Sequence, residues 1–198
     1  DNQIDKLAEA VKIMNRETVL VLNATPDDQG RIRADKEAAK LEQQLEKVQN
    51  RRRDLYVIQK FAVRIKDIQK ELLNNNPKIL HFSGHSDCHI LCFENDDGKT
   101  ATLNGAVLAD ILDAYGGLEC LVLHACYTEG IARACAKHIP FVVGSTNSIN
   151  DATAPKFTYA FYQGLAHGRT YQNAFRMGKA EVATVSPEEA ERYTIFIA

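Results

Sequence analysis

Residues 78–86 read Lys-Ile-Leu-His-Phe-Ser-Gly-His-Ser, a short apolar run that ends in small residues and a histidine. A run of this length is typical of a strand that is buried on both faces of a parallel sheet. We therefore predict a strand over residues 78–82, with the histidine carried at its tip. Residues 74–77 (Asn-Asn-Asn-Pro) come directly before it and are a strong signal for the end of a helix.

Strands and helices are expected to alternate on both sides of this stretch. Short apolar runs predict the strands, and amphipathic segments at helical spacing predict the helices. The expected strands are residues 18–23, 55–61, 118–123 and 140–143, and the expected helices are residues 34–52, 65–73, 105–114, 128–137, 152–165 and 171–185. Residues 25–33 are expected to form a loop, and residues 89–93 and 100–103 a hairpin. This order predicts an α/β fold, a three-layer sandwich with a mostly parallel central sheet and helices on both faces.

The length of 198 residues suits one domain with a sizeable core. Ahead of the alternation, Ile4, Leu7 and Val11 recur at helical spacing. We therefore predict an amphipathic helix in an N-terminal appendage over residues 1–16, and one α/β domain over residues 17–198. Since the first residue is not methionine, we expect a fragment or a processed product.

Composition argues against several classes of function. The net charge of −2 and the pI of about 6.3 leave no basic excess, which disfavours direct binding of nucleic acid. No apolar run approaches the roughly 18–20 residues that span a bilayer, and no signal peptide opens the chain, so we expect no membrane contact. An odd cysteine count without a Cys-x-x-Cys pair disfavours a disulfide framework and favours a cytoplasmic location. The cysteines are Cys88, Cys92, Cys120, Cys126 and Cys135.

Two chemically active residues, His85 and Cys126, follow two predicted strands and lie 41 positions apart. Ligands of parallel sheets bind beyond the carboxyl ends of the strands, and neighbouring strands are about 4.8 Å apart. If these two strands are neighbours, the imidazole and the thiol face one gap. Such a pair can perform nucleophilic catalysis, because a thiol at pH 7 is mostly protonated and needs a base. The alternative, a cysteine that is simply buried at a strand end, stays open.

A metal cluster is a further alternative for this region. His85, Cys88, His89 and Cys92 lie within eight residues and include soft ligands. We disfavour zinc because alternate side chains of a strand point to opposite faces of the sheet. The predicted site therefore holds no metal.

The motifs around the two residues resemble those of a known family. Residues 79–85 (Ile-Leu-His-Phe-Ser-Gly-His) and 121–127 (Leu-Val-Leu-His-Ala-Cys-Tyr) resemble the catalytic strands of caspase-like cysteine peptidases, with the bacterial CHAT group as the closest match. Residues 141–145 and 149–152 continue the resemblance, which extends from about residue 18 to about residue 185. It implies a caspase-like fold and a proteolytic activity.

The resemblance also implies a role for individual residues. Cys126 matches the family nucleophile, and His85 matches the base and acid. The oxyanion of the tetrahedral intermediate would be held by the backbone N–H groups of Cys126 and Ser86. The family usually has glycine where this chain has Ser86, whose Cβ could obstruct the backbone conformation.

Two further residues are candidates for a substrate pocket. His124 occupies the position where caspases carry glutamine and CHAT proteins often carry asparagine, and it could line the pocket or merely pack at the strand end. Asp151 follows the fifth strand, where caspase-like enzymes place pocket residues, and could pair with Lys or Arg before the cut bond. Alternatively, Asp151 caps a helix that begins at Ala152. Both alternatives stay open for each residue.

The predicted function is that of a cysteine endopeptidase, which cuts a protein or peptide substrate through a Cys126–His85 dyad and an acyl-enzyme intermediate. This chemistry needs no cofactor. The resemblance implies a bacterial defence effector, antiviral in kind, that a regulatory protein partner or an activating protease switches on. The alternatives are a catalytically inactive caspase-like module that binds a protein, and a sensor of small molecules.

Overall fold

The computed structural model describes residues 2–14, 16–29 and 34–198 of the chain. Within these residues, six strands form one sheet in the order β2-β1-β3-β7-β8-β9. The strands are β1 (Glu17–Ala24), β2 (Leu55–Lys60), β3 (Ile79–Gly84), β7 (Cys120–His124), β8 (Phe141–Ser145) and β9 (Tyr193–Ile197). Every pairing is parallel except that of β8 with β9. The predicted α/β fold with a mostly parallel sheet is therefore confirmed.

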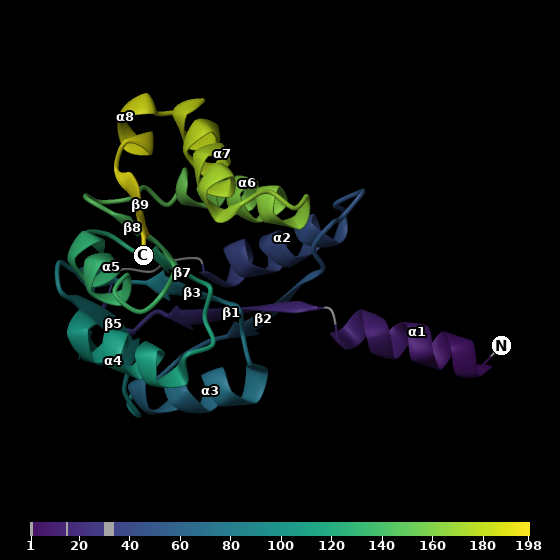
Figure 1. The fold of residues 1–198 in the computed structure, drawn as a ribbon. Helices are drawn as coiled ribbons and strands as arrows, with labels where there is room; N and C mark the ends of the chain where they lie inside the picture. The colour runs from purple at the N-terminus through teal and green to yellow at the C-terminus, as the bar shows by residue number, and fades with distance from the viewer. Residues whose placement is uncertain (1, 15, 30–33) are drawn as a thin grey trace.

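Helices cover both faces of this sheet (Figure 1). One layer consists of α2 (Ala34–Glu46), α6 (Ala154–Ala166) and α7 (Tyr171–Ala183), and the other of α3 (Ile68–Asn75), α4 (Gly105–Tyr115) and α5 (Glu129–Cys135). The apolar strands separate two cores, because alternate side chains point to opposite faces. In β1, Val19 and Val21 belong to the core under α2 and α6, whereas Leu20 and Leu22 belong to the opposite core.

A small antiparallel sheet lies beside the main one. It consists of β4 (Ser86–Asp87), β5 (Ile90–Glu94) and β6 (Thr100–Asn104). The predicted hairpin is confirmed as β5 and β6, and its turn is held by the Asn95 side chain, which accepts hydrogen bonds from the N–H groups of Asp97 and Lys99. The two-residue strand β4 comes directly after His85 and joins the hairpin to the tip of β3.

The largest differences from the sequence-based expectation lie at the ends of elements. The helix expected over residues 34–52 ends at Glu46, and the helix expected from residue 65 begins with the 3-10 turn η1 (Ile65–Asp67). After α7, the chain forms the short helix α8 (Pro187–Ala190) and then β9, which pairs with β8. β9 was not among the expected strands, because its pairing partner lies about fifty residues earlier in the chain and no turn signal joins the two. Of the loop expected over residues 25–33, residues 30–33 lie outside the described residues.

The N-terminal helix α1 (Asn2–Met14) projects away from the sheet (Figure 1). Its apolar residues Ile4, Leu7 and Val11 are all exposed. The amphipathic helix predicted here is confirmed, whereas the division at residues 16 and 17 stays a prediction, and residues 1 and 15 lie outside the described part. No helix among the described residues is long and apolar enough to cross a membrane.

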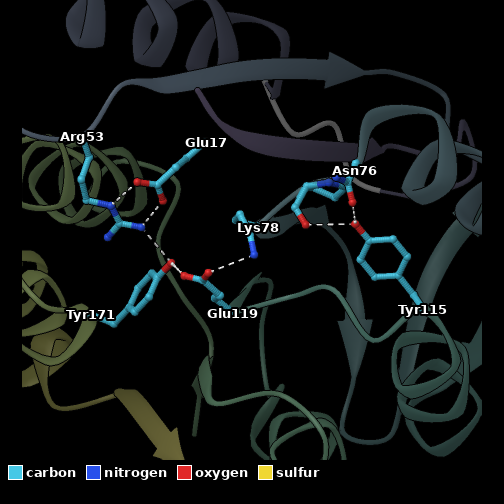
Figure 2. A network of polar contacts seen from close by, with 8 residues as sticks. Glu17, Arg53, Asn76, Lys78, Tyr115, Glu119 and Tyr171 are labelled. Atoms are coloured by element: carbon cyan, nitrogen blue, oxygen red, sulfur yellow. Dashed lines mark hydrogen bonds and ion pairs between the residues drawn. The ribbon is translucent and has the colours of Figure 1, made fainter. Parts of the chain in front are cut away.

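The amino ends of the central strands carry a network of charges (Figure 2). The Arg53 guanidinium donates two hydrogen bonds to the Glu17 carboxylate and one, at 3.0 Å, to the Tyr171 hydroxyl. That hydroxyl donates to Glu119 at 3.2 Å, and Lys78 forms an ion pair with Glu119 at 3.2 Å. Each of the four charged residues starts a strand or lies one or two residues before one, so the network ties β1, β2, β3 and β7 to the start of α7.

Candidate active site

The tips of β3 and β7 bring the two predicted catalytic residues onto neighbouring strands. The strands pair in parallel, with Ser83 opposite His124, and His85 and Cys126 each follow two positions later. Both side chains are partly buried. The Ser86 hydroxyl donates a hydrogen bond to the carbonyl oxygen of Cys126, so the residue after His85 contacts the cysteine directly. The condition that sequence analysis left open, adjacency of the two strands, is met.

The thiol of Cys126 is held by the segment that follows β8. Its Sγ accepts a hydrogen bond from the backbone N–H of Ile149 at 3.4 Å. Tyr127, the next residue, has a φ of 54° and donates its N–H to the carbonyl of Asn147 at 3.2 Å. A positive φ is uncommon for a bulky residue and persists only where the surroundings enforce it. The geometry therefore turns the chain sharply after the cysteine and leaves the thiol partly exposed.

Two buried hydroxyl groups support this turn from below. The Thr128 hydroxyl accepts the N–H of Ser145 at 2.9 Å, and the Ser145 hydroxyl donates to the carbonyl of Ala125 at 2.8 Å. Both residues are buried. Neither residue was expected to have a role, although Ser145 ends a stretch that carries the family resemblance. They connect the end of β8 to Ala125, which precedes Cys126, and to Thr128, two residues after it.

Ser86 fits its position without strain in the backbone. Its φ is not in the left-handed region that would require glycine, so the Cβ that distinguishes it from the usual family residue is accommodated. Glycine is needed two positions earlier, since a Cβ on Gly84 would lie 2.7 Å from the carbonyl oxygen of Ala24. The backbone N–H of Ser86 therefore remains a candidate donor to an oxyanion, as that of Cys126 does.

His124 and His81 form a pair of imidazoles on the face of the sheet under α6, with ring centroids 5.5 Å apart. The Nδ1 of His124 lies 3.1 Å from the Thr158 hydroxyl, and the Nδ1 of His81 lies 2.9 Å from the Tyr162 hydroxyl. Burial lowers the pKa of His124 to about 4. Burial, and then the neighbouring His124, lower the pKa of His81 well below its usual value. Both rings are therefore neutral at pH 7.

His124 also lines a cavity of about 280 Å³ between the sheet and the helices α2 and α6. The cavity is lined by Ser83 and His81 of β3 and by Thr158 and Tyr159 of α6, among others. Its sheet wall lies two residues below the tips that carry His85 and Cys126. Of the two alternatives for His124, lining a pocket and packing at the strand end, this arrangement allows both.

Asp151 is exposed, in the turn that leads into α6. It follows Asn150, whose side-chain oxygen accepts the N–H of Ala152 at 2.8 Å. The helix begins at Ala154 rather than Ala152, with Thr153 as its N-cap residue, so the expectation that Asp151 caps it is wrong. Asp151 is the neighbour of Ala152, which lines the cavity, and its role in a substrate pocket stays a prediction.

The residues considered for a metal cluster differ in burial. Cys92 is buried within β5, whereas Cys88 and His89 are exposed in the turn before it. Among residues 2–14, 16–29 and 34–198, no three His, Cys, Asp or Glu side chains are arranged to hold a metal ion.

Comparison with solved structures identifies the fold as that of caspase-like cysteine proteases. A secreted C11 cysteine protease from Bacteroides thetaiotaomicron, solved with an irreversible peptide inhibitor, matches with a TM-score of 0.64 and 13% identity over 91% of this chain and 65% of its own. The Arg-specific cysteine proteinase gingipain R matches with a TM-score of 0.60 and 12% identity over 90% of this chain and 46% of its own. A complex of the pro- and mature domains of Porphyromonas gingivalis RgpB matches with a TM-score of 0.59 and 12% identity, over 91% and 47%.

This chain thus spans less than two thirds of the length of each of these proteases. No curated protein matches its sequence closely. The sequence model of one family, the CHAT domain, matches residues 8–196, which is nearly the whole chain. The resemblance found in the strand motifs is confirmed, and the chain belongs to the CHAT domain family.

Proposed function

We propose that this chain is a cysteine endopeptidase in which Cys126 is the nucleophile and His85 the general base and acid. The observation that carries the proposal is the hydrogen bond from the Ser86 hydroxyl to the Cys126 carbonyl, which joins the two strand tips. In the first step, His85 takes the proton of the thiol and the sulfur attacks the carbonyl carbon of the peptide bond. The carbonyl oxygen becomes an oxyanion.

The backbone N–H groups of Cys126 and Ser86 hold this oxyanion in the proposed mechanism. Each such donor typically contributes about 3 kcal/mol to catalysis. The intermediate collapses when His85 gives its proton to the leaving amine, so the C–N bond breaks and a thioester remains. His85 then takes a proton from water, whose oxygen attacks the thioester, and returns the proton to the sulfur as the new carboxylic acid leaves. No cofactor enters this sequence of steps.

The substrate pocket is proposed to include His124 and Asp151. His124 lines the cavity below the dyad, and Asp151 lies beside the cavity wall at Ala152. The substrate is a protein or peptide. A role in bacterial defence within the cytoplasm, and activation by a regulatory protein or by processing, are part of the proposal; they rest on the family resemblance and on the existence of a pro-domain in one solved relative.

The proposal is tested by labelling with a thiol-reactive peptide probe, followed by mass spectrometry of each cysteine. We expect selective modification of Cys126, a loss of at least about a hundredfold in labelling rate in His85→Ala, and no peptide cleavage in Cys126→Ala. The exposed Cys88 is the internal control, because its thiol faces the Asp87 carboxylate, which raises its pKa, rather than an imidazole at a strand tip. Equal labelling of Cys88 and Cys126 would instead favour an inactive protein-binding module.

A further inference from the structure

The cavity that His124 lines begins next to the dyad. Ser83 and His124 stand opposite each other in its wall, and His85 and Cys126 follow two residues later in the chain, just beyond the ends of β3 and β7. The volume of about 280 Å³ is just below the range of cavities that bind whole ligands, and suits one side chain.

Gln59 supplies the observation that points to an occupant. It lies on β2 and lines the cavity, and its buried side-chain Nε2 has no hydrogen-bond partner among the described residues. The other end of the amide is fixed, because the Gln59 oxygen accepts a hydrogen bond from Asn23 Nδ2 at 3.1 Å. An unpaired buried donor costs about 1–3 kcal/mol. A ligand that presents an oxygen to Gln59 would recover this cost.

The two imidazoles add donors to the same wall. Each is neutral, and the Nδ1 of each ring is within hydrogen-bond distance of a hydroxyl group, that of Tyr162 for His81 and that of Thr158 for His124. When those hydroxyls donate to Nδ1, the ring proton is on Nε2, so each of these two lining residues carries a second N–H donor. The cavity wall then presents N–H donors, which an oxygen atom of a ligand can accept.

Charge around the cavity excludes a basic guest. Lys40, Lys156 and Glu181 line it, and Glu181 forms an ion pair with Lys156 at 4.0 Å. The lining therefore carries two cations and one anion that is already paired. A lysine or arginine side chain would be buried without a counter-ion, which is costly. A carboxamide oxygen brings no charge into the cavity, and the cost of burying a carboxylate is offset by the cations of Lys40 and Lys156.

We propose that this cavity binds the side chain of the substrate residue before the cut bond, and that it selects a side chain ending in a carboxamide or carboxylate, held by Gln59. The inference rests on the proposed peptidase function and names its substrate class. It differs from the hypothesis that Asp151 selects Lys or Arg, and the two make opposite predictions for the same peptides.

Binding of product-like peptides tests the inference without requiring turnover. Fluorescent peptides of one sequence, differing only in a C-terminal Gln, Glu, Leu, Lys or Arg, are titrated into the Cys126→Ala protein and followed by fluorescence anisotropy. We expect Gln or Glu to bind at least about tenfold more tightly than Lys or Arg. The Gln and Glu peptides distinguish a carboxamide from a carboxylate. Preference for Lys or Arg, equal affinities, or no binding at all would overturn the inference.

Gln59→Leu in the same Cys126→Ala background separates recognition from folding. The substitution removes the unpaired Nε2 donor and also the oxygen that accepts from Asn23, whose Nδ2 keeps its hydrogen bond to the carbonyl of Lys60. Because one unpaired donor is thus exchanged for another, we expect little change in melting temperature and loss of the Gln or Glu preference, while affinity for the Leu peptide is kept. Gln172→Leu, which replaces an exposed glutamine of α7 outside the cavity lining, is the matched control and should leave the preference unchanged. Failure of the peptidase proposal would appear separately, in the labelling of Cys126 in the unsubstituted protein.

Discussion

The two ends of the central sheet are built from opposite kinds of polar group. At the amino ends of the strands, Arg53 and Lys78 pair with Glu17 and Glu119 (Figure 2). At the carboxyl ends, the groups under α6 are neutral imidazoles and an amide nitrogen without a partner. The charged groups at the amino end are thus paired with one another. At the carboxyl end, which is proposed to bind a ligand, a hydrogen-bond donor has no partner. Buried polar groups without a hydrogen-bond partner are expected chiefly at functional sites.

Two members of the amino-end network, Arg53 and Tyr171, have raised pKa values. The hydrogen bonds to Glu17 are the main cause that raises the pKa of Arg53. Burial raises the pKa of Tyr171, so its hydroxyl keeps the proton that it donates to Glu119. The Arg53 guanidinium also lies over the Tyr171 ring, 5.1 Å from its centroid. Neither Arg53 nor Tyr171 therefore loses its proton near neutral pH.

Breaking the amino-end network is expected to have the largest effect on stability. Arg53→Met removes the guanidinium from Glu17 and Tyr171 and leaves a partly buried carboxylate unpaired, which we expect to lower the free energy of unfolding by about 3 kcal/mol. Urea denaturation measures the loss. Lys78→Met is the matched control, because its ion pair with Glu119 is more exposed and should contribute no more than about 1 kcal/mol. Equal effects of the two substitutions would contradict the comparison.

The carboxyl end should instead give the fold its dependence on pH. The pKa of His124 is about 4 in the folded state and about 6.5 in the unfolded chain. As the pH falls from 6.5 towards 4, the unfolded chain binds a proton that the folded protein refuses, so stability falls. We expect His124 alone to account for a loss of about 2 kcal/mol between pH 7 and pH 5, and the buried His81 to add to it with the same sign.

Replacing the imidazole sharpens this test. In His124→Gln, the free energy of unfolding measured by urea denaturation should depend less on pH between 7 and 5 than in the unsubstituted protein. His167→Gln, which removes an exposed imidazole, is the control and should leave the pH dependence unchanged. If the two variants behave alike, the pH dependence originates elsewhere in the molecule.

The elements that sequence analysis found are those whose signals are local. The apolar runs of β1, β3, β7 and β8 predict buried parallel strands, and the hairpin follows from its own turn residues, Asn95 to Gly98. That β3 and β7 are neighbours could only be assumed from the sequence, because the order of strands depends on how the helices pack over the sheet. The family resemblance, more than periodicity, pointed to His85 and Cys126.

The parts that could not be predicted depend on contacts between distant residues. Gln59 lies on a strand of ordinary composition, and only the bond from Asn23 and the absence of a partner on its Nε2 give it significance. Thr128 and Ser145 become supports of the Cys126 turn only when β7 and β8 are neighbours. The start of α6 was expected two residues too early, at Ala152. There the side chain of Asn150, not that of Asp151, accepts the N–H of Ala152 in the turn before the helix.

The smallest effect expected in this comparison comes from a single oxygen atom at the amino end. Tyr171→Phe keeps the ring that packs on Phe141, with centroids 4.8 Å apart, and removes only the hydroxyl that accepts from Arg53 and donates to Glu119. Because Arg53 keeps Glu17 and Glu119 keeps Lys78, we expect a loss of about 1 kcal/mol in urea denaturation. A loss as large as that of Arg53→Met would mean that the hydroxyl, rather than the guanidinium, joins the two ion pairs into one network. A loss near zero would mean that the two pairs act independently, each stabilising only the strands that it contacts.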